Sequence, residues 1–303
     1  MNERVVSFII PFRNASIERE RNCFSTLKWV ITHYPNCEII LAEHGSKTEF
    51  PLELGTINQI YVGNELEPFN KSKIMNQAAI LACHDVLIFL DSDIIIDPED
   101  LNRCIISCQQ EFEAVNPFNV VIDLPEDLSE MIHNSPDMKL NYPIAEKDKS
   151  ECRDFLNFSG GMVLIRKSNF VQIGGWPEEF WGWGGEDDVF AYKIERFLKF
   201  KTFKNPVYHL YHKRTTYETV AENPEYLANC EAMDRIIRYT DTQLIDYCMK
   251  SKEALVKFPV NELLSNPIRH DLAKELIIRH ERVNLDDLIE DGKVVYYPTI
   301  QLS

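Results

Sequence analysis

The sequence lacks long apolar runs and the marks of a targeting segment. None of its apolar runs approaches the length of about 18 residues that a membrane-spanning helix needs. The N-terminal stretch MNERVVSFII has neither the long apolar core nor the small-residue cleavage site of a signal peptide. We therefore expect a protein without transmembrane segments that works in the cytoplasm.

Basic residues are also scarce. The 303-residue chain has 32 Lys and Arg against 48 Asp and Glu, so its formal charge is −16. So acidic a chain is a poor general binder of nucleic acid or of anionic membranes, although a phosphate compound could bind in a locally basic pocket. The eight cysteines include no CxxC pair, which argues against a structural zinc site. We expect free thiols in a reducing compartment.

What the sequence does contain is an alternation of short apolar strands and amphipathic helices. Strands are predicted at 4–10, 37–43, 58–63 and 85–91, and helices at 16–34, 71–83 and after Asp97. This order predicts an α/β fold with a Rossmann-like, mostly parallel sheet flanked by helices. Residues 123–156 indicate a long loop with short helical pieces. Strands at 158–166 and 206–212 enclose a helix at about 187–199, and the pattern after residue 214 is mostly helical.

Two groups of residues could bind a metal ion. Asp91 and Asp93 end the predicted strand DVLIFLD, where ligands of open α/β sheets bind, and carboxylates suit Mg²⁺ or Mn²⁺ shared with a diphosphate. The alternative is a turn in which one aspartate caps a helix. In YHLYH, His209 and His212 could reach one ion, which would favour Mn²⁺; otherwise one is a core histidine and the other is exposed.

The stretch WGWGGEDD, residues 181–188, combines aromatic, glycine and acidic residues. The tryptophans offer flat apolar faces to a sugar ring, and the glycines permit a tight loop beside a ligand. Glu186, Asp187 and Asp188 could accept hydrogen bonds from hydroxyls, and one could act as a general base. The simpler interpretation is that the acids favour a helix N-terminus, but that role requires neither two tryptophans nor three glycines.

Two further segments, IIPFRN and FNKSK, join an aromatic ring to a cation and an amide. The pairs are Phe12 with Arg13 and Phe69 with Lys71. Such a combination could stack on a nucleobase and hold phosphates.

Together and in this order, the motifs IIPFRNA, FNKSK, FLDSD, FSGGMVLIR, WGWGGEDD and YHLYH resemble the β-1,4-galactosyltransferase family, whose fold is GT-A. The resemblance covers about residues 5–213. It assigns the binding of a UDP-sugar donor to Pro11, Phe12, Arg13, Phe69, Lys71, Asp91, Asp93, Gly161, Trp183 and Glu186. It assigns the acceptor to Phe158, Trp183, Gly185, Asp187 and Asp188, with Asp187 as the catalytic base. It assigns the metal to Asp93, His209 and His212, with His209 in the place of a methionine common in the family.

Besides His209, the sequence departs from the family pattern at Ala15, Lys71 and Phe158. Ala15 replaces a second arginine, and Lys71 replaces an arginine, so the bidentate fork for the diphosphate is lost. Phe158 stands where relatives use tyrosine or a smaller residue to choose between galactose and N-acetylgalactosamine.

The resemblance implies an inverting, metal-dependent transferase that moves galactose or N-acetylgalactosamine from a UDP-sugar to a glycan or glycolipid hydroxyl. The cofactor would be Mn²⁺, with Mg²⁺ or Co²⁺ as replacements, and peripheral contact with a membrane is compatible with this role. One rival is a carbohydrate- or nucleotide-sugar-binding protein that has lost turnover. Another, a nucleotidyltransferase, would need a glycine-rich phosphate loop, which PFRNAS is not. We expect a catalytic domain at 1–213, comprising a donor half (1–122), a loop (123–156) and an acceptor half (157–213), followed by a helical extension at 214–303.

Overall fold

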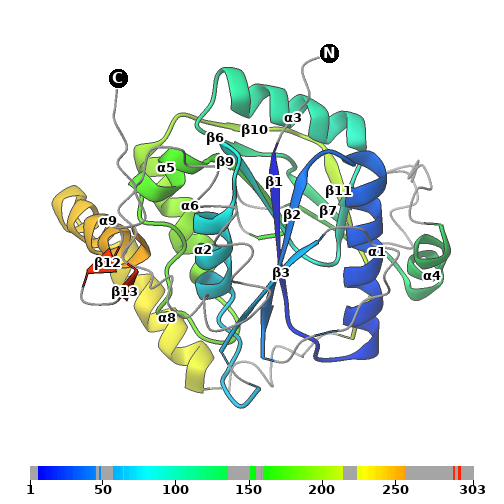
Figure 1. Cartoon of the computed structure of the whole chain (residues 1–303), viewed down its shortest axis with the longest axis horizontal. Coiled ribbons are helices and arrows are strands. Elements are labelled where there is room, and N and C mark those ends of the chain that lie inside the picture. Colours follow the sequence, from blue (N-terminus) through cyan, green and yellow to red (C-terminus); the bar gives the residue numbers. More distant parts are fainter. Residues whose placement is uncertain are drawn as a thin grey trace.

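The computed structural model describes residues 6–45, 48, 57–63, 65–135, 151–154, 158, 160–213, 224–256, 289–290 and 293–294. Within these residues the chain forms a central sheet with helices on both faces, as Figure 1 shows. The predicted α/β architecture is therefore confirmed. No helix among the described residues combines the length and the apolar character that crossing a bilayer would require.

The central sheet has seven strands in the order β10-β6-β9-β4-β1-β2-β3. Their bounds are Ser7–Phe12 (β1), Glu38–His44 (β2), Asn58–Val62 (β3), Val86–Leu90 (β4), Ala114–Asn116 (β6), Met162–Arg166 (β9) and Phe200–Thr202 (β10). All neighbouring pairs are parallel except those of β9, which runs antiparallel to β4 and β6. The sheet is thus mostly parallel, and the carboxyl ends of β1, β2, β3 and β4 lie along one edge.

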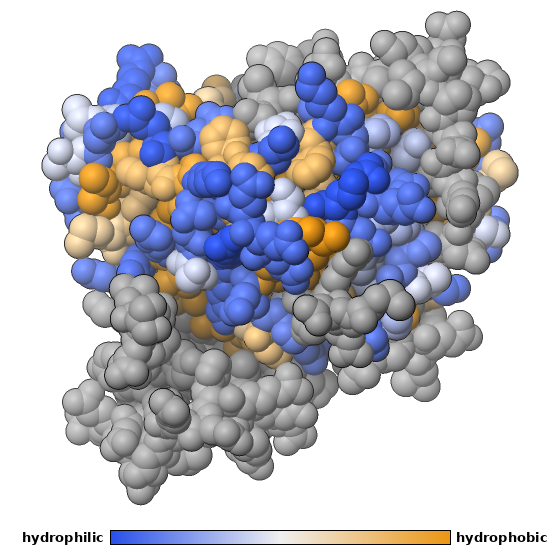
Figure 2. Space-filling model, turned by 90° about the horizontal axis from the view of Figure 1, so that it is seen from above, coloured by the Kyte–Doolittle hydropathy of each residue, from blue (hydrophilic) through white to orange (hydrophobic). Residues whose placement is uncertain are grey.

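Two apolar clusters cover the two faces of this sheet. Phe8 and Ile10 of β1 pack with α1 (Ile17–His33) and α3 (Pro98–Gln110), whereas Ile9 packs with α2 (Lys71–Leu81), α5 (Lys167–Gln172) and α6 (Glu186–Phe197). Successive strand residues point to opposite faces, so one continuous apolar run serves both clusters. Burying each large apolar side chain contributes about 1.5–3 kcal/mol. Figure 2 shows the surface of one face of the molecule, where hydrophilic residues surround smaller apolar areas.

A second sheet has the order β5-β11-β7-β8. Its strands are Ile94–Ile96 (β5), Val120–Asp123 (β7), Glu151–Asp154 (β8) and Pro206–His209 (β11). The segment predicted as a loop at 123–156 therefore begins at the last residue of β7 and contains both helix α4 (Glu126–Asn134) and strand β8. Residues 136–150 of that segment lie outside the described residues.

Two helices, α8 (Pro224–Ile237) and α9 (Asp241–Val256), follow the second sheet. A third apolar cluster of Phe180, Val189, Ile236 and Leu244 joins them to the start of α6. Figure 1 shows them beside α5 and α6, and the short pair β12 (Ile289–Glu290) and β13 (Lys293–Val294) completes the described chain. Most of the predicted extension, residues 257–288 and 295–303, lies outside the described residues.

Candidate active site

The antiparallel pairing of β4 and β9 brings two of the predicted motifs together. Leu90, the last residue of β4, pairs with Met162, the first residue of β9. Gly161 therefore lies beside Asp91. The Asp91 N–H donates to the Gly161 carbonyl at 2.8 Å, and the Gly161 N–H donates to Asp91 Oδ2 at 3.2 Å. The backbone of Gly161, at the start of β9, thus holds the carboxylate of Asp91 at the end of β4.

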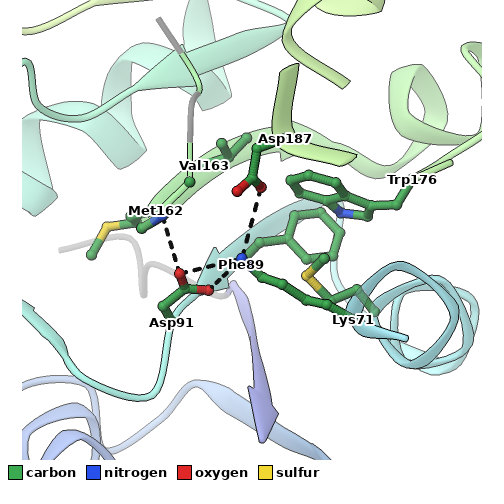
Figure 3. Close-up of a pocket in the computed structure, with 10 residues that line it drawn as sticks. Lys71, Phe89, Asp91, Met162, Val163, Trp176 and Asp187 are labelled. Atoms are coloured by element: carbon green, nitrogen blue, oxygen red, sulfur yellow. Dashed lines mark hydrogen bonds and ion pairs between the residues drawn. The ribbon is translucent and has the colours of Figure 1, made fainter. Parts of the chain in front are cut away.

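Lys71 joins Asp91 to the acidic motif. Its ammonium lies 2.9 Å from Asp91 Oδ1 and 3.7 Å from Asp187 Oδ1, and both contacts are drawn in Figure 3. Lys71 is the first residue of α2, whose N-cap Asn70 accepts the Lys73 N–H at 2.8 Å. A small pocket opens at this junction. It is lined by Lys71, Met75, Phe89, Asp91, Gly160, Gly161, Met162, Val163, Trp176 and Asp187.

Asp187 is the carboxylate in this pocket best suited to take a proton. Its Oδ1 is buried and has no hydrogen-bond partner among the described residues, where Lys71 approaches it at 3.7 Å. Burial raises the pKa of Asp187 well above its usual range, and Glu186 raises it further, while Lys71 opposes the shift. For Lys71, burial would lower the pKa, but the charges of Asp187 and Asp91 outweigh burial and raise it. The pair is therefore an ammonium facing a carboxylate of increased basicity.

The three predicted metal ligands lie together at the edge of the second sheet. β11 runs antiparallel to β5 with His209 opposite Ile94, which puts His209 next to Asp93. The Nε2 atoms of His209 and His212 lie 3.6 and 3.3 Å from Asp93 Oδ2. One ligand atom from each residue falls within 4.8 Å of the others. One carboxylate oxygen and two imidazole nitrogens in so compact a group fit a divalent transition-metal ion.

The same group has the electrostatics of a cation site. Burial would raise the pKa of Asp93, but the two histidines outweigh it and hold that pKa well below its usual range. Burial would likewise lower the pKa of His209, but Asp93 and Asp123 raise it to about 9. The only described cation of a lysine or arginine side chain within ion-pair distance of Asp93 is Arg19, at 3.8 Å.

Sequence reasoning missed Asp123, which orients one of these ligands. In the parallel pair of β7 and β11, Asp123 lies opposite His209, and its Oδ1 is 2.9 Å from His209 Nδ1. A carboxylate that accepts a hydrogen bond from Nδ1 fixes the orientation of the imidazole ring and leaves Nε2 available to bind a metal. The available signal was an acidic residue directly after the apolar run VVI, but it had been included in the predicted loop.

Hydrogen bonds with α1 and α4 also fix Tyr211, which lies between His209 and His212 in the chain. The Tyr211 N–H donates to Ser129 Oγ of α4 at 2.8 Å, and the Asn22 amide of α1 donates to the Tyr211 carbonyl at 3.0 Å. His133 of α4 lies 2.8 Å from Asn22 Oδ1, so that both helices hold the segment. These residues were not anticipated, because nothing local in the sequence connects them to the histidines.

The residues predicted for the nucleotide lie at the ends of β1 and α2. Phe12 is only 2% exposed and packs in the core, so that its backbone rather than its ring could meet a ligand. The Arg13 guanidinium donates to the carbonyls of Glu65 and Glu67 at 3.0 and 2.8 Å, just before Phe69. Pro11 lies inside β1, which was predicted to end there; the strand continues because β1 keeps its pairing with β2 to Phe12.

Four residues predicted near the acceptor are placed differently from one another. Phe158 is fully buried and packs edge-on against Phe200 at 5.6 Å, so that its ring does not line the pocket. Gly185 begins α6 with φ 92°, and a side chain there would meet Phe180 at 2.6 Å. Trp183, by contrast, is 63% exposed. Asp188 is half-buried in the first turn of α6, and Glu186, beside Asp187, is largely buried.

Comparison with known proteins gives sequence relatives among glycosyltransferases. β-1,4-Galactosyltransferase 2 of Cricetulus griseus is 30% identical over 138 residues, which are 43% of this chain and 29% of the relative. Validoxylamine A glucosyltransferase of Streptomyces hygroscopicus is 24% identical over 63% of this chain and 51% of the relative. The matched region thus spans less than a third of the galactosyltransferase's length.

Solved structures with a similar chain path include Drosophila β1,4-galactosyltransferase 7 in complex with manganese, UDP-Gal and xylobiose. It has a TM-score of 0.40 and 15% identity over 72% of this chain and 79% of that one. Glucosyl-3-phosphoglycerate synthase of Mycobacterium tuberculosis has a TM-score of 0.48 and 12% identity over 76% and 80%.

The family to which the chain belongs follows from a match that spans most of the described fold. The model of the family named Glycosyltransferase like family 2 matches residues 7–219, from the start of β1 to beyond His212. The α/β architecture with its mostly parallel sheet is the GT-A arrangement that the motifs implied. Because this match covers more than half of the sequence, the chain belongs to the glycosyltransferase like family 2.

Proposed function

We propose that this protein is an inverting, metal-dependent glycosyltransferase that moves galactose or N-acetylgalactosamine from a UDP-sugar to a hydroxyl of a glycan or glycolipid. Family membership supports sugar transfer, and the galactosyltransferase relatives support a galactose-type donor. The observation that carries the proposal is the position of Asp187, a partly buried carboxylate facing Lys71 and the Asp91 motif across one pocket.

In the proposed reaction, Asp187 accepts the proton of the acceptor hydroxyl while the hydroxyl oxygen forms a bond to the anomeric carbon. The bond from that carbon to the diphosphate oxygen breaks, and its electron pair leaves with UDP, so that the configuration inverts. The raised pKa of Asp187, caused by burial, makes it a stronger base than an exposed aspartate. The Lys71 ammonium offers positive charge beside the departing diphosphate. Because this charge is already in position, the site needs little reorganisation as the reaction proceeds.

The donor would be held by the predicted residues at the edge of the central sheet. Arg13, fixed on two carbonyls of the segment that precedes Phe69, would order the nucleotide side. Asp91, Glu186 and the backbone of Gly161 would hold the sugar, because carboxylates accept the hydrogen bonds of hydroxyls. On the acceptor side, the exposed indole of Trp183 and the half-buried carboxylate of Asp188 are the proposed contacts.

Asp93, His209 and His212 would hold the metal ion, for which we propose Mn²⁺, with Mg²⁺ or Co²⁺ as weaker replacements. Imidazole nitrogens beside a carboxylate favour Mn²⁺ over Mg²⁺. When bound, the ion supplies positive charge that stabilises the diphosphate leaving group.

The test is a donor screen by UDP release with Mn²⁺ and mixed glycan acceptors, comparing the UDP derivatives of galactose, N-acetylgalactosamine, glucose and N-acetylglucosamine. We expect one of the first two donors to be used best, chelator to abolish release, and Mn²⁺ to restore it. Full turnover in chelator would exclude the metal-dependent mechanism. Donor binding without release for any acceptor would favour the rival function, a sugar-nucleotide-binding protein without turnover.

A further inference from the structure

Helix α8 lies outside the segment that matches the family, yet it contacts the WGWGG loop, residues 181–185. The family match ends at residue 219, and α8 begins at Pro224. The side chain of Asn229, on α8, is 4% exposed and makes three hydrogen bonds to this loop. The helix therefore contacts the loop that precedes the proposed base.

Asn229 bonds the loop in both directions. Its Oδ1 accepts the Trp181 N–H at 3.3 Å, while its Nδ2 donates to the Trp181 carbonyl at 2.7 Å and to the Trp183 carbonyl at 3.2 Å. A primary amide offers one oxygen acceptor and a nitrogen with two hydrogens to donate, so Asn229 matches one N–H and two carbonyls of the loop backbone. These bonds fix a segment whose glycines all have positive φ.

Tyr226, one turn before Asn229, packs on the same loop. Its ring stacks on Trp183 with the centroids 5.4 Å apart and the planes at 25°. A side chain at Gly184 would meet the Tyr226 ring at 3.2 Å. Gly184, at φ 98°, therefore leaves room for a ring of the protein itself, whereas the sequence had suggested a tight loop beside a ligand.

The Trp183 indole remains 63% exposed although Tyr226 covers it in part. An exposed indole that is already held by a stacked ring and a hydrogen-bonded backbone loses little conformational entropy when a ligand binds. The loop leads directly into Asp187 and Asp188, whose carboxylates suit hydroxyl groups. An apolar ring face next to hydroxyl acceptors is complementary to a saccharide ring, which has an apolar C–H face and a polar rim.

We infer that α8 completes the acceptor side of the site: Asn229 fixes the WGWGG loop and Tyr226 backs Trp183, so that Trp183 presents its exposed face to a saccharide ring of the acceptor. Asn229 and Tyr226 are positioning residues, and the inference rests on the proposed function for the identity of the acceptor site. It also places α8 with the catalytic unit, beyond the boundary at residue 213 that the sequence suggested.

The first experiment measures binding without turnover. Acrylamide quenching of tryptophan fluorescence is followed with UDP and Mn²⁺ present, as the β-methyl glycosides of galactose, glucose, xylose and N-acetylglucosamine are titrated in. We expect at least one glycoside to protect the wild type and to give no protection in Trp183→Phe. If none of the four glycosides protects the wild type from quenching, or if protection is equal in Trp183→Phe, then Trp183 does not bind a saccharide ring and the inference is overturned.

The second experiment tests the two positioning residues. Tyr226→Ala should raise the acceptor KM roughly two- to tenfold, the range of a stacked aromatic pair, and more than it raises the donor KM. Tyr226→Phe keeps the ring and should restore the wild-type value. Asn229→Asp, nearly the same in shape, turns the donor toward two carbonyls into an acceptor, and should speed amide hydrogen exchange at residues 181–185 and raise the acceptor KM about tenfold or more.

The control is Glu231→Ala, an exposed position on the same helix, which should leave both KM values and the exchange unchanged. Unchanged acceptor KM in Tyr226→Ala and Asn229→Asp, in an enzyme that turns over, would overturn the inference and leave the proposed function standing. If the wild type releases UDP from no donor, the proposed function fails, and the quenching and exchange experiments still decide the role of α8.

Discussion

The carboxylate of Asp123 lies 2.9 Å from Nδ1 of His209, on the side of the imidazole opposite to Asp93. The two residues face each other because β7 and β11 are paired in parallel. Nδ1 of His209 is therefore hydrogen-bonded to Asp123, and Nε2 is directed at the candidate metal position. Asp123 acts on the site through this histidine.

Asp123→Asn should weaken metal binding while leaving the fold intact. The amide keeps the size of the side chain but removes the charge that orients the imidazole and raises its basicity, so we expect Mn²⁺ affinity to fall about 10- to 100-fold. Calorimetric titration of the metal-free protein with Mn²⁺ measures this directly. Asp127→Asn, an exposed carboxylate on α4, is the matched control. Equal affinities in the two variants would show that Asp123 has no role at the metal site.

Asp187→Asn should reduce kcat by roughly 10²- to 10⁴-fold, because a positioned base contributes about that much and the amide cannot accept the proton. Donor and Mn²⁺ binding should persist, as measured by calorimetry. Asp188→Asn is the companion variant and should raise the acceptor KM more than it lowers kcat. An active Asp187→Asn beside a dead Asp188→Asn would move the base to Asp188.

The acidic limb of the kcat/KM profile should lie above the usual aspartate range near pH 4, because burial raises the pKa of Asp187. Activity is then lost as the pH falls and Asp187 takes up a proton. Lys71→Met removes the cation that opposes this shift, so the limb should move to higher pH in that variant, whatever its effect on the maximal rate. A limb that stays near pH 4 in both proteins would exclude Asp187 as the titrating base.

Lys193 makes a prediction about stability. It is fully buried in α6, donates to the Gly175 carbonyl, and burial lowers its pKa to about 8. Since its pKa in the folded state lies below the unfolded value of 10.5, the buried charge destabilises the fold fully below pH 8. This penalty, on the order of 3 kcal/mol, is relieved as the pH rises from 8 to 10.5.

The measurement is urea unfolding of the wild type and Lys193→Met at several pH values. The free energy of unfolding of the wild type should rise relative to that of Lys193→Met between pH 8 and 10.5. Lys250→Met, an exposed lysine on α9, should show no such trend. Parallel pH curves for the wild type and Lys193→Met would mean that the ammonium is not destabilised by burial.

Local signals predicted most of the regular structure. Helix α3 begins as expected, with the Asp97 carboxylate accepting the N–H groups of Glu99 and Asp100 at 2.8 and 3.4 Å. Strands β5, β6 and β10 were missed because three residues each are too few to show a period. β8 was missed because its residues, ECRD, are polar and take the extended form through pairing with β7.

The residues of the candidate site could be predicted, but several of their surroundings could not. Asp93, His209 and His212 do lie together, as the predicted metal site requires. Phe158 shows the limit: the family resemblance implied a contact with sugar, but φ 57° and packing on Phe200 direct its ring into the core. The partners of the WGWGG loop come from α8, where the sequence offered no motif.

By itself the sequence determined the α/β class and the residues able to carry the chemistry, because residue type and short-range spacing encode strands, helices and ligand preferences. Only the tertiary structure decided which of those residues meet. The antiparallel register of β9 on β4 puts Gly161 beside Asp91, and that of β11 on β5 puts His209 beside Asp93. Such registers depend on packing between segments far apart in the chain, and a slip by one residue would turn these side chains to the opposite face.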